Sequence, residues 1–538
     1  MAINSISGST SGSLLRISGL ASGIDTESMI KQLMDAERIP LNKLFQDRQL
    51  LQWKQEKYRE IYASLKELRD SAFDMKLQGT FLAKQVVSTD ESVVTATATT
   101  ASANISYTFK NVTLATAEST WGDSIKSGTY TGTISTTQTF KQLADANVFA
   151  VPLDTTASTQ QFTIKSYDQN GKVLSDTISI DINQDSIATL VDKINKSKAG
   201  VNAFFDTNSN KLVITSKLTG DNNSGSASIQ INDSTGNLMN GVMGMLSGDT
   251  FDSSKRQLGS DASFQINGLS TTRKSNIFTI DGTTFTLKGA SGSNDVTVSV
   301  NNDVDKVYDT IKSFIDQYNK TLDLLNTTTA EKRYRDYPPL LDEQKKDMKD
   351  SEIELWEEKA KSGLLSNDAL LQRAISNFRT TIYARVGGMT GQIDQLAEIG
   401  ITTESYTDSE GGVVITGGKL VIDEQKLRDA LVNSPDEVMD LFTKSSDTPG
   451  EKGIANRLYD TVNQVMSDII DKAGRDDNDT NSALYKQMKD MNTRIDDMQR
   501  HLTDVENRYY AQFSAMEQAL NQMNQQSMWL MQQFGGGQ

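Results

Sequence analysis

The chain has 538 residues, too many for one hydrophobic core, so we expect several folding units of roughly 100–200 residues each. Its 54 basic and 70 acidic side chains give a formal net charge of −16, which argues against nucleic acid binding and against docking on anionic membranes. The chain contains no cysteine, which excludes disulfides, thiol nucleophiles and cysteine-ligated metal centres.

Two sequence features bear on where the protein acts. No run of about 20 apolar residues is present, so insertion into a membrane is not expected. The first residues, Met1 to Leu20, are rich in Ser and Gly and lack the apolar run of roughly 7–15 residues that marks a secretory signal peptide. The protein is therefore expected either to stay in the cytoplasm or to leave the cell by a route that needs no cleaved Sec signal.

The N-terminal region is helical in pattern. We expect a disordered or helical leg segment over 1–40, with Asp25 or Thr26 as a helix N-cap, followed by the first helix of a helical bundle over 41–85. Pro40 is suited to the first position of that second helix. Apolar residues recur there every seven positions, which predicts a coiled-coil seam. The seam residues are Leu44, Leu51, Tyr58 and Leu65.

The middle of the chain is predicted to form strands. Residues 86–300 are rich in Ser, Thr, Asn, Asp and Gly and show short apolar alternations. Asp281-Gly282 is the strongest hairpin signal, and Asn170-Gly171 predicts another. One helix is expected from Ser186 to Ser197. We expect two β-rich head domains, a proximal one and a distal one. Their ranges are 86–120 plus 255–302 for the proximal domain and 121–254 for the distal domain.

Helical periodicity returns after the strands. Residues 303–480 are predicted to form a helical bundle carrying a small β-hairpin, whose turn we place at Gly417-Gly418. Ser434 to Glu437 reads as a capping box with Pro at the first helical position. The charged stretch 331–361 is expected to be a solvated helix. Trp356 on this helix is the predicted aromatic anchor of the bundle.

Residues 481–538 are predicted to form a C-terminal coiled-coil leg. Apolar residues alternate there in steps of three and four over more than four heptads, with one stutter. The predicted interface residues are Met491, Ile495, Met498, Leu502, Val505, Tyr509, Phe513, Met516, Leu520 and Met523. Because such narrow stripes need partner helices, we expect the two legs to close against each other but to stay partly open in a monomer, and then to meet neighbouring legs or flagellin. Arg48, Gln55 and Arg494 are expected to weaken these contacts.

No catalytic, cofactor or metal site is predicted. The single histidine, His501, lies within the C-terminal heptads, where Asp504 offers a surface pair but no catalytic triad forms. Neither a P-loop nor a dinucleotide-binding glycine motif occurs. The acidic run Asp476 to Asp479 lacks the glycine and the bidentate acid of a calcium loop. An extracellular hydrolase stays open as an alternative only because carboxylates are plentiful.

Several segments resemble one protein family. Segments in the second half of the chain are similar to a signature of bacterial flagellar filament capping proteins (FliD, hook-associated protein type 2), and the two ends are similar to that family's start and tail. These segments are Tyr337 to Leu340, Glu352 to Leu365, Leu396 to Thr403, Gly418 to Leu431 and Ser434 to Phe442, with Arg16 to Met34 and Tyr509 to Phe534 at the ends. Ser186 to Asn195 resembles a motif shared among flagellar hook-associated proteins.

The resemblance implies an α+β multidomain fold with β-rich head domains inserted between helical, coiled-coil arms. It further implies a non-enzymatic structural cap at the extracellular tip of the flagellum, with about four to six copies in a homo-oligomeric ring. The resemblance also implies export through the flagellar type III apparatus and flagellin as the partner that inserts and folds beneath the legs. An export chaperone is expected on the C-terminal helix. The alternative is an extracellular adhesin whose head binds host glycans.

Overall fold

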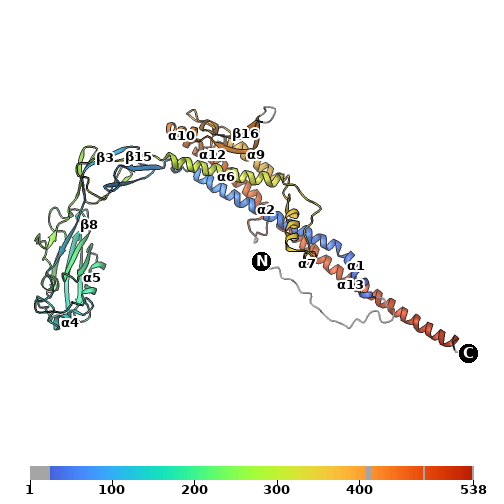
Figure 1. Ribbon diagram of the computed structural model, residues 1–538, viewed down its shortest axis with the longest axis horizontal. Coiled ribbons are helices and arrows are strands. Elements are labelled where there is room, and N and C mark those ends of the chain that lie inside the picture. The colour runs from blue at the N-terminus through green and yellow to red at the C-terminus, as the bar shows by residue number, and fades with distance from the viewer. Residues whose placement is uncertain (1–24, 408–412, 477–478, 536–538) are drawn as a thin grey trace. The chain divides into compact units, whose positions relative to one another are not determined.

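The protein divides into two compact units. The computed structural model describes residues 25–407, 413–476 and 479–535. The helical unit comprises Met1–Phe81 and Asp305–Gln538, and the strand unit comprises Leu82–Val304. The chain leaves the helical unit once and returns to it once (Figure 1). This arrangement confirms the predicted α+β class, in which strand-rich structure is inserted between helical arms.

The helical unit holds most of the helices. Its α-helices are α1 (Thr26–Glu37), α2 (Ile39–Met75), α3 (Gln78–Phe81), α6 (Val304–Ala330), α7 (Asp342–Lys346), α8 (Asp350–Lys361), α9 (Ala369–Tyr383), α10 (Glu424–Asn433), α11 (Pro435–Thr443), α12 (Ile454–Ala473) and α13 (Ala483–Phe534). Two 3-10 turns are η2 (Leu396–Ile399) and η3 (Pro449–Glu451). One antiparallel pair of strands, β16 (Ile401–Thr407) and β17 (Val413–Ile422), is attached.

Local sequence chemistry sets where the long helices begin. The Asp25 carboxylate accepts a 3.0 Å hydrogen bond from the amide of Ser28 and caps α1, as the sequence indicates. Pro40 lies in the first turn of α2, where its missing N–H costs nothing. The Ser482 hydroxyl accepts a 3.4 Å hydrogen bond from the amide of Tyr485 at the start of α13.

The bundle core forms where α12 packs against α2 and α9, and side-chain contacts hold α6 beside α2. Apolar residues at steps of three and four give each helix one buried stripe. Those stripes include Tyr58, Ile61, Leu65 and Leu68 of α2, Ile311, Phe314, Tyr318 and Leu322 of α6, Leu371, Ile375, Phe378 and Ile382 of α9, and Leu458, Val462, Val465 and Ile469 of α12. A 3.0 Å hydrogen bond between the hydroxyls of Ser64 and Thr321 joins α2 to α6. Two predicted leg residues, Tyr58 and Leu65, therefore belong to this core.

The predicted hairpin turn at Gly417-Gly418 is wrong. Strand β17 runs through both glycines and pairs with β16, and the ladder shifts register between Thr403 and Ser405. Gly417 and Gly418 have φ of +57° and +84°, so they form an irregularity within the strand. The Gly417 carbonyl then accepts hydrogen bonds from Arg379 of α9 and Asn326 of α6, which fastens the strand to the bundle.

The prediction of a capping box at Ser434 is also wrong, although α11 does start at Pro435. The Ser434 side chain makes no capping hydrogen bond. The Glu437 carboxylate instead accepts hydrogen bonds from the amides of Gln392 (2.9 Å) and Ile393 (3.1 Å). This carboxylate therefore serves a loop that is distant in sequence, rather than its own helix terminus.

The strand unit contains four antiparallel sheets. Their orders are β1-β15-β3-β11-β12, β13-β14-β2, β10-β4-β8-β7 and β6-β5-β9. The strands are β1 (Lys84–Ser88), β2 (Val94–Ala98), β3 (Ser106–Thr113), β4 (Ala117–Trp121), β5 (Thr159–Tyr167), β6 (Val173–Asp181), β7 (Val201–Asp206), β8 (Lys211–Thr219), β9 (Gln230–Thr235), β10 (Arg256–Gln257), β11 (Ala262–Ile266), β12 (Leu269–Arg273), β13 (Ile277–Ile280), β14 (Thr283–Leu287) and β15 (Val296–Asn302). The helices are α4 (Phe140–Asp145), α5 (Ile187–Lys196) and the π-helical turn η1 (Leu238–Val242).

Two hydrophobic cores fill this unit. One is rich in aromatic side chains. The ring centroid of Phe109 lies 5.5 Å from that of Phe264 and 5.2 Å from that of Phe285. The other is built from the sheets containing β5 and β8 with α4, α5 and η1. The division into 86–120 plus 255–302 and 121–254 stays a prediction, and β4 and β10 of the proximal range pair in one sheet with β8.

The strongest predicted hairpin is confirmed. Ile280 pairs with Thr283, and Asp281 and Gly282 have φ of +48° and +74°. These angles suit the two-residue turn that Asp-Gly favours between antiparallel strands.

Candidate assembly surface

The predicted leg residue Leu44 and those from Met491 to Phe513 meet in one cluster of the helical unit. In this cluster α1 and the first part of α2 pack against α13. The buried members are Ile30, Met34, Leu41, Leu44, Ile495, Leu502 and Val505, and the partly buried members include Met491, Met498, Tyr509 and Phe513. The two arms therefore close against each other as far as Val505, as expected, because the chain's own α1 and α2 cover α13 there.

Polar residues along this packing make specific contacts. Gln55, only 6% exposed, donates a 2.7 Å hydrogen bond from its Nε2 to the carbonyl oxygen of Ala473. Arg48 donates a longer, 3.4 Å hydrogen bond to the side chain of Asn492. The expectation that these two residues only weaken the leg contacts is wrong, because both join α2 to the C-terminal part of the chain.

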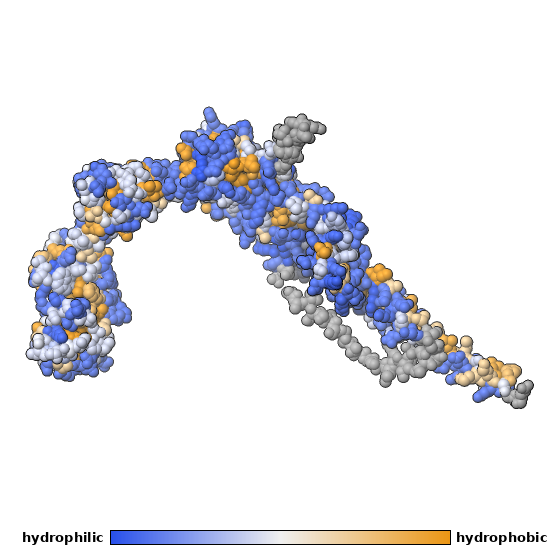
Figure 2. All heavy atoms as spheres, viewed as in Figure 1, coloured by the Kyte–Doolittle hydropathy of each residue, from blue (hydrophilic) through white to orange (hydrophobic). Residues whose placement is uncertain are grey.

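The last part of α13 is different. Every residue from Asn521 to Phe534 is exposed, and we call this segment the leg tip. Its large apolar side chains are Met523, Met528, Trp529, Leu530, Met531 and Phe534, of which Phe534 is 83% exposed. They gather in the hydrophobic colour at the end of α13 in Figure 2. Just before the leg tip, Met516 is exposed and Leu520 is half-buried. In the described residues, no helix is long and apolar enough to cross a membrane.

Trp356 lies outside the bundle core. It packs with Tyr337 against Leu50 and Trp53 of α2, and its indole Nε1 donates a 2.8 Å hydrogen bond to the carbonyl oxygen of Pro338. The surrounding segment is not one solvated helix, because it forms two short helices, α7 and α8, after an irregular stretch. Trp356 thus fastens this segment to α2, a helix of the bundle, and its role as the aromatic anchor stays a prediction.

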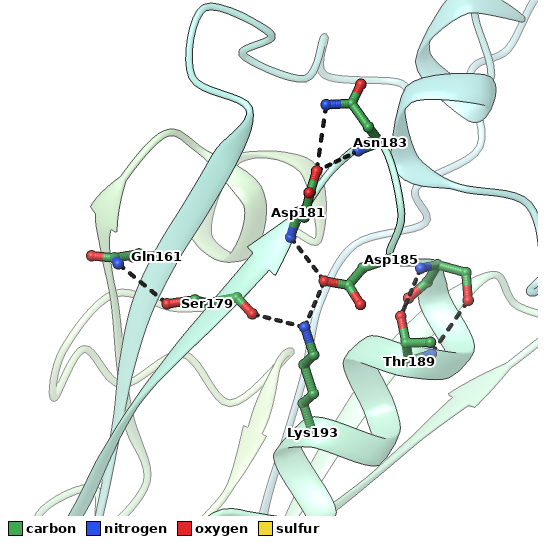
Figure 3. A network of polar contacts seen from close by, with 8 residues as sticks. Gln161, Ser179, Asp181, Asn183, Asp185, Thr189 and Lys193 are labelled. Carbon is green, nitrogen blue, oxygen red and sulfur yellow. Dashed lines mark hydrogen bonds and ion pairs between the residues drawn. The ribbon is translucent and has the colours of Figure 1, made fainter.

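A polar network fixes the junction between β6 and α5 in the strand unit (Figure 3). The Asp185 carboxylate accepts hydrogen bonds from the Asp181 amide at 2.8 Å and from Lys193 Nζ at 2.5 Å. Lys193 also donates to the carbonyl oxygen of Ser179 at 3.0 Å. Although burial opposes it, the Lys193 ammonium and the Asp181 amide hold the pKa of Asp185 below its usual range. The network thereby ties α5 to the end of β6.

A second buried polar contact joins β4 to β10. Glu118 and Arg256 are 3% and 1% exposed, and the Arg256 Nε lies 3.6 Å from the Glu118 Oε1. Glu118 also accepts hydrogen bonds from the amides of Ser228 (2.5 Å) and Ile229 (3.1 Å). Burial raises the pKa of Glu118, against the effect of these partners, and burial lowers the pKa of Arg256. Nothing in the sequence marks this pair, because its members lie on strands far apart along the chain.

The described residues contain no metal-binding cluster. No group of three or more His, Asp and Glu side chains could hold a metal ion in this part of the chain. His501 is exposed on α13, and within the described part of the chain no hydrogen bond or ion pair joins it to Asp504. The middle of the acidic run, Asp477 and Asn478, lies outside the described residues.

Known proteins align with nearly the whole chain. Family models described as flagellar hook-associated protein 2 N-terminus and C-terminus match residues 22–118 and 259–525. A model described as the flagellin hook IN motif matches residues 161–217, which include the Asp185 network. The flagellar hook-associated protein 2 of Halalkalibacterium halodurans is 34% identical over 558 aligned residues, covering 97% of this chain and 100% of the relative. The Thermotoga maritima protein of the same name is 26% identical, covering 97% and 96%.

A solved structure shares the fold. The D1-D2-D3 domains of the flagellar cap protein FliD from Escherichia coli superpose with a TM-score of 0.53 at 18% identity. The superposition covers 81% of this chain and 99% of that one.

Proposed function

The chain belongs to the flagellar hook-associated protein 2 family, and from that premise we propose how its two units work in the filament cap. As a member of this family it is a structural protein of the filament cap, located outside the cell at the flagellar tip, and not an enzyme. In our proposal the strand unit gathers about four to six copies into a plate. The helical unit then forms legs that promote the insertion and folding of flagellin.

The exposure of apolar side chains on the leg tip is the observation that supports this proposal most strongly. Its apolar side chains sit on a helix that no other described element covers. Fully burying one such side chain contributes about 1.5–3 kcal/mol, so a row of them favours association with another helix. Four of the six are methionine or tryptophan, and methionine tolerates repacking against changing partners. A leg that must release one flagellin and accept the next suits such a surface.

The family forms an oligomeric cap, whereas the partners of this chain are proposals. Flagellin is the proposed partner of the leg tip in the filament. Before export, an export chaperone is the proposed partner of the same C-terminal helix, since a capped apolar end prevents early association. Nucleic acid and membrane insertion have no part in this proposal, in keeping with the net charge of −16.

Truncation of the leg tip tests the proposal. A chain lacking residues 521–538 is expressed in a flagellated strain that lacks its own cap protein, beside the full chain and a control lacking only 536–538. We expect the full chain and the control to restore filaments, while the truncated chain folds and assembles but loses flagellin to the medium. Filaments of normal length with the truncated chain would contradict the proposed role of the leg tip.

A glycan-binding head stays a prediction beside the cap role. A shallow groove on the strand unit is lined by uncharged polar side chains, among them Asn111, Gln265 and Thr271. Such groups can donate hydrogen bonds to sugar hydroxyls and accept hydrogen bonds from them. Binding of the full chain to a glycan array, lost on substitution of Gln265, would support it.

A further inference from the structure

The helical unit contains a polar cleft with an excess of positive charge. The cleft has a volume of about 760 Å³ and lies between α2, α13 and the segments that follow α6 and α8. Four basic side chains and two carboxylates line it, together with apolar and neutral residues. The charged residues are Lys54, Arg333, Arg335, Arg494, Asp47 and Asp490, and we call this feature the basic cleft.

Hydrogen bonds and close backbone packing join the two segments that form the base of the basic cleft. Arg333 Nη1 donates hydrogen bonds to the carbonyl oxygens of Ala360 (2.5 Å) and Ser362 (2.9 Å), which joins the segment after α6 to the end of α8. Gly363 has a φ of +58°, and a Cβ there would lie 2.6 Å from the Arg333 amide nitrogen. Only glycine permits so close an approach of the two backbones. The cleft is thus preformed rather than created by a ligand.

The charge within the cleft is unbalanced. The guanidinium of Arg333 is bonded to backbone carbonyl oxygens. The other three basic side chains make no ion pair within the described residues; these are Lys54, Arg335 and Arg494. Burial lowers the pKa of Arg333, and the nearby charge of Arg335 lowers it further. Two guanidinium groups therefore repel each other here, and Glu331 offsets part of that repulsion, so further negative charge from a ligand would be favourable.

We propose that the basic cleft binds acidic side chains of a second copy of this chain within the assembled cap. The inference rests on the proposed function, since it assumes that the helical units of neighbouring copies meet. The chain carries 16 more acidic than basic groups overall, so an approaching copy presents a mainly negative surface. The basic cleft is a positively charged exception on that surface. Opposite charges of this kind steer association and fix its register.

Charge reversal in the cleft tests the inference. The variant Arg335→Glu/Arg494→Glu is compared with Arg373→Glu/Lys472→Glu, which makes the same charge change at exposed positions of α9 and α12 outside the cleft. Self-association is measured by sedimentation velocity at about 50 mM salt, where surface charges are weakly screened. We expect the control to associate like the wild type and the cleft variant to associate about tenfold more weakly or worse. Circular dichroism checks that all three chains fold.

The outcomes separate the two proposals. Equal association of the cleft variant and its control overturns the basic-cleft inference and leaves the proposed cap assembly standing. A wild-type chain that never self-associates overturns the assembly proposal itself, and the inference with it.

A cross-linking experiment identifies the occupant of the cleft. Because the chain has no cysteine, Ser366→Cys places a single thiol at the cleft wall, to which a photoactivated cross-linker is attached. In the assembled oligomer we expect a link to a peptide of a second copy that is rich in Asp or Glu. The absence of any link between copies, or a link only to added flagellin, would overturn the inference.

Discussion

The hydroxyl of Tyr509 donates a 3.0 Å hydrogen bond to the carboxylate of Glu37, which joins α13 to the end of α1. Around this contact α13 is packed against the chain's own helices, and every residue from Asn521 to Phe534 is exposed. The exposed part runs about 21 Å at 1.5 Å per residue. One helix thus combines a covered stretch, which stabilises the monomer, with an uncovered tip, which is available for assembly.

Truncating one leucine in each part of α13 should separate their roles. Leu502 is 6% exposed within the leg cluster, whereas Leu530 is 46% exposed on the leg tip. We expect Leu502→Ala to lower the stability of the helical unit by about 2–5 kcal/mol, because it leaves a cavity. Leu530→Ala should change stability by less than about 0.5 kcal/mol and weaken only assembly. Thermal unfolding and sedimentation of both variants check this, and equal melting temperatures would contradict it.

Removing the Gln55 side chain should destabilise the end of α12. The variant Gln55→Ala leaves the carbonyl oxygen of Ala473 without the 2.7 Å hydrogen bond that it accepts. An unsatisfied buried acceptor costs about 1–3 kcal/mol. The matched control is Gln52→Ala, since Gln52 is an exposed glutamine on the same helix. Native-state hydrogen exchange should show faster opening of the last turn of α12 in the first variant alone.

The buried pair Glu118 and Arg256 should show strong coupling. Replacing one member, as in Glu118→Gln or Arg256→Met, leaves a buried charge without its partner and should cost about 3–5 kcal/mol. The double variant should cost clearly less than the sum of the two single variants. Hydrogen exchange of β4 and β10 measures these free energies, and strictly additive values would show that the pair does not interact.

The Asp185 network should make the strand unit sensitive to acid. Because its folded-state pKa lies below the unfolded value of about 3.9, ionised Asp185 stabilises the fold above that pH. The contribution is lost as the pH falls through the folded pKa. Asp185→Asn should therefore cost about 1–3 kcal/mol at pH 7, and this difference from the wild type should shrink below about pH 4. A difference that stays constant from pH 7 to pH 3 would contradict this explanation.

Features coded by neighbouring residues could be predicted from the sequence. Asp281-Gly282 specifies its own turn, Asp25 and Pro40 mark the starts of two helices, and Ser186 and Ser197 flank the predicted α5. Each of these depends on side chains within a few positions. The apolar stripes of the legs were equally visible, because helical periodicity is a local property.

Features that depend on distant partners could not be predicted. Gln55 looked like a fault in a coiled-coil seam because its acceptor lies 418 residues further along the chain. In the same way, two adjacent glycines predicted a turn at Gly417-Gly418. The hydrogen bonds that hold this part of β17 come from α6 and α9, which are distant in sequence, so the local pattern could not reveal them. The basic cleft depends on α13 lying beside α2, so no pattern in either helix alone indicates it.

Hydrogen exchange of α13, in the isolated chain and in the assembled cap, tests the central claim most directly. In the isolated chain, amides around Leu502 should be protected, whereas those from Asn521 to Phe534 should exchange rapidly. On assembly with flagellin, the leg tip should become protected while the Leu502 region changes little. A leg tip that is already protected in the monomer, or that stays unprotected in the working cap, would contradict the account.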